Sequence, residues 1–214
     1  MIKTETRAKG RQKSVTAGTD EKRERILKVA EQLFAAQGYA DTTLDQIVGQ
    51  LGVTKPFVYY YFRNKQEIFE TLSWKPTVEC FTTLDFAADD MRPAHEKLAQ
   101  GLEQLIRATI NNHPSAFFAY RDPQAFRPEM HAAQKKIANY FYDRMCALLD
   151  EAKRDGMVDF NETRITAQAA CSIPGFLYNW YRPDGRLPPE AMVQELSQLA
   201  WRVIGLRKTR RRPR

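Results

Sequence analysis

The residues of this chain best suited to chemistry are hydrogen-bond donors and aromatic rings gathered in one short run, TKPFVYYYFRNK, at positions 54–65. Threonine, lysine and tyrosine side chains donate hydrogen bonds to phosphate oxygens, and apolar side chains contact thymine methyl groups. Rings exposed on a cationic helix are costly unless another surface covers them. The run therefore favours non-covalent binding of a polyanion, and the alternative is that the rings pack against a neighbouring part of the protein.

The sequence offers few residues with the types and spacing that catalytic sites require. His95, His113 and His131 are the only histidines, and the sequence contains no nucleophile elbow, phosphate-binding loop or HExxH motif. The three cysteines are widely spaced without a CxxC pair, which predicts buried thiols rather than a disulfide framework or a zinc site. The sequence thus predicts no catalytic residue, no metal and no cofactor. A helical enzyme acting on an acyl thioester and a protein-interaction module that does not bind DNA remain alternatives.

The charge of the chain is concentrated at its two ends. Residues 1–65 carry a net charge of +5, residues 66–206 carry −4, and residues 207–214 carry +6, within the +7 of the whole chain. A phosphate backbone attracts local positive charge, so the ends are expected to approach a polyanion and the middle is not. No apolar run approaches the roughly 20 residues of a membrane span, and the polar start lacks an apolar signal segment. We expect a cytoplasmic protein without a membrane partner.

Local signals predict short helices after a basic arm at residues 1–19. Asp20 caps the first helix, whose apolar residues form one stripe and which ends at Gly38. Thr43 and Gln46 fit a capping box at the start of a second helix, and a glycine turn ends that helix.

A third helix is predicted over Lys55–Phe62, with Thr54 as its cap and Pro56 in its first turn. Val58 and Phe62 lie one turn apart and face inward. The outer surface of this helix then carries Lys55, Phe57, Tyr59 and Tyr61. A helix, a tight turn and a second helix with donors on its outer face are typical of a helix-turn-helix that enters the major groove of DNA.

The stretch ILKVAEQLFAAQGYADTTLDQIVGQLGVTKPFVYYYFRNKQEIF, within residues 23–72, resembles the DNA-binding domain of the TetR family of transcriptional regulators. Phe57 departs from the family pattern, which commonly has a small or hydroxylated residue at this position, so an operator sequence is not transferred from relatives. The resemblance implies a homodimer that contacts double-stranded operator DNA through Thr43, Thr54, Lys55, Pro56, Phe57, Tyr59, Tyr61 and Lys65.

The whole chain is predicted to be all-α. We expect a three-helix DNA-binding domain at residues 20–65, a larger helical ligand-binding and dimerisation domain at residues 66–206, and a disordered basic tail at residues 207–214, matching the disordered arm at residues 1–19. Within the larger domain, Pro76 is expected to kink or interrupt the helix that starts near Lys65.

Periodicity predicts four further helices in the larger domain: Pro93–Asn112, Pro128–Gly156, Glu162–Trp180 and Pro189–Leu206. The last two combine small and apolar residues on one side, which allows close helix packing against a second copy of the chain. The alternative is that both helices close the core of the monomer. The residues predicted at the dimer interface are Ala169, Ser172, Met192, Leu196, Leu199 and Val203.

The middle helices carry more aromatic rings than a small helical core usually needs, together with a few polar groups and two helix-interrupting prolines. We interpret this as a chamber for a partly apolar ligand, and the alternative is ordinary core. The predicted pocket residues are Trp74, Phe81, His113, Phe117, Phe118, Tyr120, Arg121, Tyr140, Phe141, Phe176, Asn179 and Trp180.

A second, narrower resemblance lies in YNWYRPDGRLPPEAM, which is similar to a segment of those TetR-family members that regulate fatty-acid, steroid or acyl-CoA catabolism. It implies an acyl-CoA or a large hydrophobic acid as the effector. Together the two resemblances predict a ligand-responsive repressor that binds a palindromic operator as a dimer and is released from DNA by a small hydrophobic or acyl-CoA-like molecule.

Overall fold

The structure is a computed structural model that describes residues 5–207, with side chains from residue 19 onward. Most of the predicted basic tail and residues 1–4 of the predicted arm lie outside the described residues. Helix α1 begins at Glu5, upstream of the cap that the sequence predicts at Asp20, so the described part of the arm is helical.

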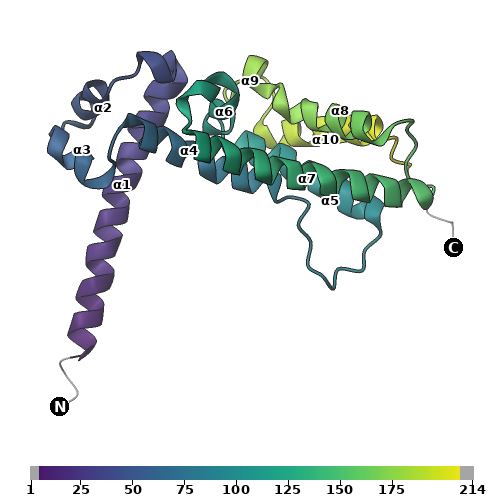
Figure 1. The fold of residues 1–214 in the computed structure, drawn as a ribbon, viewed down its shortest axis with the longest axis horizontal. Coiled ribbons are helices and arrows are strands. Elements are labelled where there is room, and N and C mark those ends of the chain that lie inside the picture. Colours follow the sequence, from purple (N-terminus) through teal and green to yellow (C-terminus); the bar gives the residue numbers. More distant parts are fainter. Residues whose placement is uncertain (1–4, 208–214) are drawn as a thin grey trace. The chain divides into compact units, whose positions relative to one another are not determined.

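Every regular element between residues 5 and 207 is a helix (Figure 1), which confirms the predicted all-α fold. None of the described helices combines the length and apolarity needed to cross a bilayer. In chain order the elements are α1 (Glu5–Asp41), α2 (Leu44–Leu51), α3 (Lys55–Tyr61), α4 (Lys65–Phe81), α5 (Ala94–Asn111), the short 3₁₀ helix η1 (Ser115–Phe117), α6 (Phe118–Arg121), the 3₁₀ helix η2 (Pro123–Ala125), α7 (Pro128–Arg154), α8 (Thr163–Gly175), α9 (Leu177–Trp180) and α10 (Pro189–Val203).

The chain forms two compact units. The first, which we call the head, comprises the described residues up to Leu72 together with the short segment Arg121–Phe126. The second, which we call the body, comprises Ser73–Tyr120 and the described residues from Arg127 onward. The boundary therefore lies within α4 and not at the predicted position between residues 65 and 66. A further difference is that the head takes six residues from the middle of the chain.

The head is built around a small apolar core to which each of its helices contributes. α1 packs on α2 and α2 on α3, with the chain reversing direction at the tight turn between them. The fully buried apolar side chains of this core are Ile26, Ala30, Phe34, Ile47, Val58, Ile68 and Phe69. Val58 is thus on the inner face of α3, as its spacing predicts.

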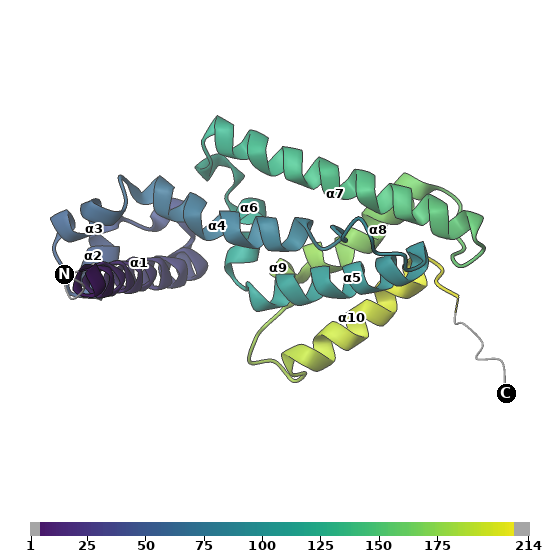
Figure 2. The same ribbon diagram turned by 90° about the horizontal axis from the view of Figure 1, so that it is seen from below.

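The body is a bundle in which α5 packs on α7 and α10, and α8 packs on the same two helices (Figure 2). Gly101 on α5 allows a close approach, because a Cβ atom there would clash with the side chain of Leu84. After α10, the amide of Asp159 donates to the main-chain oxygen of Gly205, which has a positive φ of 63°. These contacts hold the ends of the long helices together around one apolar core.

Two predicted helix boundaries in the body differ from the structure. α4 continues through Pro76. The proline removes only one helical hydrogen bond, the one to the carbonyl of Leu72. Buried side chains before and after it, such as Phe69 and Cys80, hold the helix in place. The helix predicted over Glu162–Trp180 is divided into α8 and α9 at Phe176, two residues after Pro174.

Candidate DNA-reading surface and ligand cavity

The turn between α2 and α3 is fixed by local hydrogen bonds. The Thr43 amide donates to Gln46 Oε1 at 2.7 Å, and the Gln46 amide donates to Thr43 Oγ1 at 3.2 Å, which completes the predicted capping box. α2 ends at Gly52, whose φ of 66° and ψ of 34° lie in the left-handed region that favours glycine. The two helices are therefore set in one orientation by residues that contact only their neighbours in sequence.

The outer surface of α3 is rich in donors and rings. Thr54 precedes the helix, and its side chain makes no capping hydrogen bond to it. Tyr59 is 52% exposed and Tyr60 is 77% exposed, while the ring of Phe57 packs on that of Tyr61 with centroids 5.3 Å apart. This surface presents hydroxyl groups outward and keeps a partly covered apolar patch beside them.

Tyr60 is the most exposed ring of α3, and it was not among the predicted contact residues. Its position follows from periodicity: with Val58 and Phe62 buried, a residue two places after Val58 lies on the opposite side of the helix. The sequence pattern therefore contains the signal that identifies Tyr60.

Lys55 and Asp45 form an ion pair on this surface, with Lys55 Nζ 2.7 Å from Asp45 Oδ1. Both side chains are mostly exposed, and the hydrogen bond that Lys55 donates to Asp45 raises the pKa of Lys55. An exposed ion pair contributes little to stability. The pair thus places one cation and one carboxylate side by side at the start of α3.

Lys65 has a different environment from the other predicted contact residues. Its Nζ atom donates to the main-chain oxygens of Tyr39 and Thr42, each at 2.6 Å, and lies 4.1 Å from the centre of the Tyr39 ring. Burial lowers the pKa of the Lys65 ammonium. In the described head, this side chain joins the first turn of α4 to the end of α1.

Arg121 belongs to the head, although the sequence predicts it in the ligand pocket. Its guanidinium donates from Nη2 to the main-chain oxygen of Phe34 at 2.8 Å and from Nη1 to that of Ala35 at 3.0 Å. α1 departs from helical geometry at Gly38, which has a φ of 85°. The guanidinium therefore supplies donors to carbonyls near this break.

The residues after Arg121 also contact the head. The amide of Tyr39 donates to Asp122 Oδ2 at 3.4 Å, and Gln66 Nε2 donates to the main-chain oxygen of Ala125 at 2.9 Å. The ring of Phe126 packs on Phe69, with centroids 5.2 Å apart. We refer to residues 121–126 as the bracket of the head.

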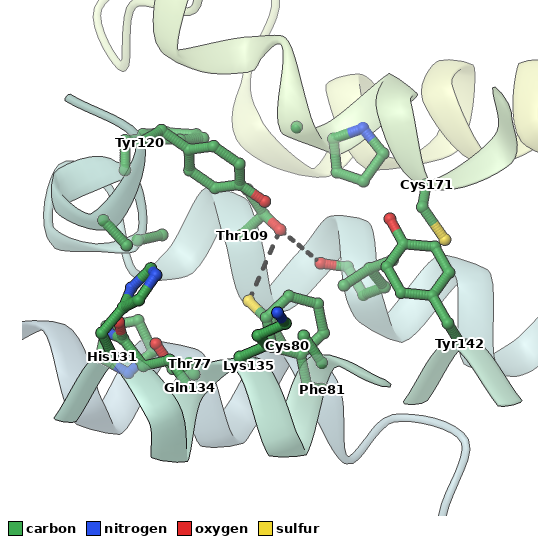
Figure 3. A pocket seen from close by; sticks show the side chains of 18 residues that line it. Thr77, Cys80, Phe81, Thr109, Tyr120, His131, Gln134, Lys135, Tyr142 and Cys171 are labelled. Carbon is green, nitrogen blue, oxygen red and sulfur yellow. Dashed lines mark hydrogen bonds between the residues drawn. The ribbon is translucent and has the colours of Figure 1, made fainter. Parts of the chain in front are cut away.

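The body contains a cavity of about 410 Å³ between α4, α5, α6, α7 and α8 (Figure 3). This volume is within the usual range for small-molecule sites, about 300–1,000 Å³. The residues that line it are Pro76, Thr77, Cys80, Phe81, Leu105, Thr109, Ala116, Phe117, Ala119, Tyr120, His131, Gln134, Lys135, Ala138, Tyr142, Cys171, Pro174 and Gly175. Most of these side chains are apolar, so the cavity favours a mainly apolar ligand.

One wall of the cavity carries neutral polar groups. Cys80 Sγ lies 3.6 Å from Thr109 Oγ1, and the Thr109 hydroxyl donates to the main-chain oxygen of Leu105 at 2.8 Å. Burial raises the pKa of the Cys80 thiol to about 11 and that of the Tyr142 hydroxyl to about 12. Near neutral pH both groups carry their protons and are uncharged.

Of the predicted pocket residues, Phe81, Phe117 and Tyr120 line this cavity. Phe118 and Phe141 are buried in the core, and the ring of His113 packs against Phe117 and Tyr181. The others lie elsewhere: Trp74 and Tyr140 line a separate shallow hollow with Lys136, Arg121 belongs to the head, and Phe176, Asn179 and Trp180 are exposed.

The residues predicted at a dimer interface lie on α8 and α10, which pack against each other. Leu196 is buried within the monomer, whereas Leu199 is 45% exposed and Val203 is 40% exposed. Ala169 is also exposed, and Ser172 and Met192 are half-buried. Ile165, on α8, adds a 70% exposed apolar side chain.

Two family matches cover most of the chain. Residues 91–204 match the family described as "Tetracyclin repressor-like, C-terminal domain", and residues 26–72 match "Bacterial regulatory proteins, tetR family". The chain is 26% identical over 204 residues to the HTH-type transcriptional activator FasR of Mycolicibacterium smegmatis, covering 85% of this chain and 82% of that protein. It is 40% identical over 60 residues to the HTH-type transcriptional regulator SrpR of Pseudomonas putida, covering 28% of each.

Solved structures share the fold. The TetR-family regulator PfmR from Thermus thermophilus has a TM-score of 0.71 and 23% identity, covering 86% of this chain and all of that one. AibR, in a complex with isovaleryl coenzyme A and operator DNA, has a TM-score of 0.70 and 16% identity, covering 87% of this chain and all of that one. The matches to both domains set aside the enzyme and the protein-interaction alternatives. This chain belongs to the tetR family of bacterial regulatory proteins, whose members are DNA-binding transcriptional regulators.

Proposed function

We propose that this protein is a repressor that binds a palindromic operator as a homodimer and leaves the DNA when a small, mainly apolar effector enters the body cavity. The observation that carries the proposal is the exposed, donor-rich surface of α3, which is set in place by the cap at Thr43 and the turn at Gly52. In a helix-turn-helix, the amino-terminal residues of the second helix meet the edges of the base pairs.

The residues proposed to contact DNA without an ionic group divide into two sets. Thr43, Thr54, Tyr59, Tyr60 and Tyr61 carry hydroxyl groups that suit phosphate oxygens, which position a protein on DNA without reading its sequence. Phe57 and Pro56 suit the methyl group of thymine.

The ion pair between Lys55 and Asp45 suits one G·C base pair. Guanine presents the acceptors N7 and O6 in the major groove, and cytosine presents the N4 amino donor. A lysine beside a carboxylate offers the complementary donor and acceptor, and their separation of 2.7 Å allows both to meet a single base pair. In this proposal Lys55 contacts the guanine and Asp45 accepts from the cytosine.

Dimerisation supplies the second head that a palindrome requires. The exposed apolar residues Ile165, Leu199 and Val203 on α8 and α10 support a two-fold interface, in which the same surface of each copy meets its partner. Two heads then contact half-sites about 34–36 Å apart, one turn of the DNA.

The effector class is proposed to be an acyl-CoA or another hydrophobic acid. The mainly apolar lining of the cavity supports this class, and AibR, which shares the fold, has been solved with isovaleryl coenzyme A. A ligand changes DNA binding only if it binds the DNA-bound and free shapes with different affinity.

Two continuous segments connect the cavity with the head in this proposal. α4 lines the cavity from Pro76 to Phe81 and begins in the head at Lys65. Tyr120 lines the cavity and is followed directly by the bracket, residues 121–126. A ligand that displaces Tyr120 or α4 therefore acts on residues that are covalently joined to the head.

Selection of duplexes from a random pool by the full-length protein tests the proposal. We expect enrichment of an inverted repeat, and a mobility shift that an effector reverses. Lys55→Met and Asp45→Asn are each expected to relax the preference at the same G·C pair, with about 1–3 kcal/mol of discrimination lost. Enrichment of no sequence would refute the DNA-reading role of α3, and enrichment of a single asymmetric site would refute the symmetric dimer.

A further inference from the structure

The lining of the cavity carries positive charge and no negative charge. The lining contains the cation Lys135 and the titratable donor His131, and none of its eighteen residues is an aspartate or a glutamate. A lysine that faces a cavity without a carboxylate has no counter-ion within that lining. The cavity is therefore complementary to a ligand that carries negative charge.

These charged and polar groups come from one face of α7. His131, Gln134 and Lys135 are spaced by three and four residues, so they lie on the same side of the helix, and Figure 3 shows them at the same wall of the cavity. Ala138 and Tyr142 continue the same stripe. Along α7 the lining thus changes from polar and cationic to mainly apolar.

Gln134 provides a second and independent observation. Its Nε2 atom is buried and has no hydrogen-bond acceptor among the described residues. Buried amide donors almost always have a partner, because water can no longer satisfy them. An acceptor on a bound molecule would satisfy this donor.

We propose that the effector is a free monocarboxylate with an apolar body. This inference rests on the proposed role of the cavity as the effector site. Its carboxylate accepts hydrogen bonds from Lys135, His131 and Gln134. His131 and Lys135 are exposed, so the head group lies at the mouth of the cavity. The apolar body extends between Phe81 and Pro174.

The volume of the cavity limits the size of this ligand. At roughly 30 Å³ for each water-sized group, 410 Å³ holds about 14 such groups. A carboxylate with about ten carbon atoms therefore fits this space. At the position beside Lys135, a free acid places a charged carboxylate where a thioester would place an uncharged carbonyl, and the lysine favours the carboxylate.

Calorimetric titration of the full-length protein with four ligands that share a ten-carbon chain tests this inference. The ligands are decanoate, 1-decanol, decyltrimethylammonium and decanoyl-CoA. We expect decanoate to bind about tenfold more tightly than decanol, and the cation to bind most weakly, since a charge-assisted hydrogen bond is lost in the alcohol. Equal affinity for decanoate and decanol, or tighter binding of decanoyl-CoA than of decanoate, would overturn the inference.

Two variants locate the carboxylate. Lys135→Met is expected to reduce the affinity for decanoate about tenfold and to leave that for decanol unchanged, because it removes the charge and keeps an apolar chain. Lys136→Met is the matched control: it removes the same charge from the next residue, which lines the separate shallow hollow, and decanoate binding should not change. An equal effect of the two variants would contradict the assigned site.

A mobility shift with the selected operator, run on the same preparations, separates this inference from the proposed function. If the protein binds the operator but binds all four ligands equally well, the proposed DNA-reading role stands and the carboxylate site is refuted. If the protein binds decanoate without any change in operator affinity, the carboxylate site stands and its role in regulation is refuted.

Discussion

Arg121 Nη2 lies 2.8 Å from the main-chain oxygen of Phe34, which joins a residue from the middle of the chain to the first helix of the head. In an uninterrupted helix, the carbonyls of Phe34 and Ala35 would accept from the amides of residues 38 and 39. The backbone departs from helical geometry at Gly38, and the amide of Tyr39 donates to Asp122. Arg121 and Asp122 therefore satisfy main-chain groups at the break in α1.

Replacing Arg121 by methionine should destabilise the head by about 1–3 kcal/mol, because carbonyls near the break lose charge-assisted hydrogen bonds. Thermal unfolding and amide hydrogen exchange at Tyr39 measure this effect. Operator affinity should fall with it. Arg186→Met, in an exposed loop of the body, removes the same charge and should leave both measurements unchanged. Identical exchange in the two variants would contradict the role of Arg121.

Replacing Lys65 by methionine should lower the free energy of unfolding by about 1–3 kcal/mol, since the main-chain oxygens of Tyr39 and Thr42 lose a charged donor. Urea denaturation gives this quantity. The salt dependence of operator binding tests the alternative, that Lys65 contacts a DNA phosphate. In that case, removing the lysine would lower the magnitude of the slope of log affinity against log salt concentration by about one. We expect the slope to be maintained, and a lower slope at unchanged stability would restore the DNA contact expected from the family resemblance.

Local signals in the sequence determine much of the head. The capping box at Thr43, the glycine turn and the spacing of Val58 and Phe62 depend on residues a few positions apart, and the structure has each of them. The position of Lys65 depends on the end of α1, more than twenty residues away in sequence. A pattern of neighbouring residues carries no information about such a contact.

The cavity was harder to predict for the same reason. Aromatic residues that share one region of the sequence divide in space between the cavity, the core and the surface: Phe117 lines the cavity, Phe141 is buried in the core, and Trp180 is exposed. Which of these places a ring occupies depends on helix packing. The polar stripe of α7 has a visible spacing of three and four residues, but an exposed helix face has the same spacing, so the sequence alone does not distinguish the two.

Replacing Leu199 by glutamate should convert the dimer to a monomer, because a charge is placed in an apolar interface whose partner copy offers the same surface. Analytical ultracentrifugation measures the oligomeric state. The monomer should bind a palindromic operator much more weakly than the wild type. Met91→Glu, at a 90% exposed side chain in the loop before α5, is the matched control and should remain dimeric. Monomers in both variants, or dimers in both, would contradict the assigned interface.

The stability of the body should decrease at alkaline pH through Cys80. Burial raises the pKa of this thiol from 9.0 to about 11, so the unfolded chain releases the proton first. The stabilising contribution is complete below pH 9 and is lost as the pH rises towards 11. This increase in the pKa of Cys80 corresponds to roughly 3 kcal/mol of stability.

Urea denaturation of wild type and Cys80→Ala at about pH 8 and about pH 10 isolates this contribution. The absolute stability of the variant differs because a side chain is removed from the cavity wall, but the loss of stability between the two pH values should be smaller than in the wild type. An equal loss in both proteins would assign the alkaline sensitivity to other groups.

The bracket at residues 121–126 makes the DNA-reading unit discontinuous in the gene. A hybrid regulator that joins residues 1–72 to the carboxy-terminal portion of a relative would exchange the operator preference but leave out the ring of Phe126 on Phe69 and the guanidinium at the end of α1. A hybrid that keeps this operator preference therefore has to take both the amino-terminal stretch and residues 121–126 from this protein.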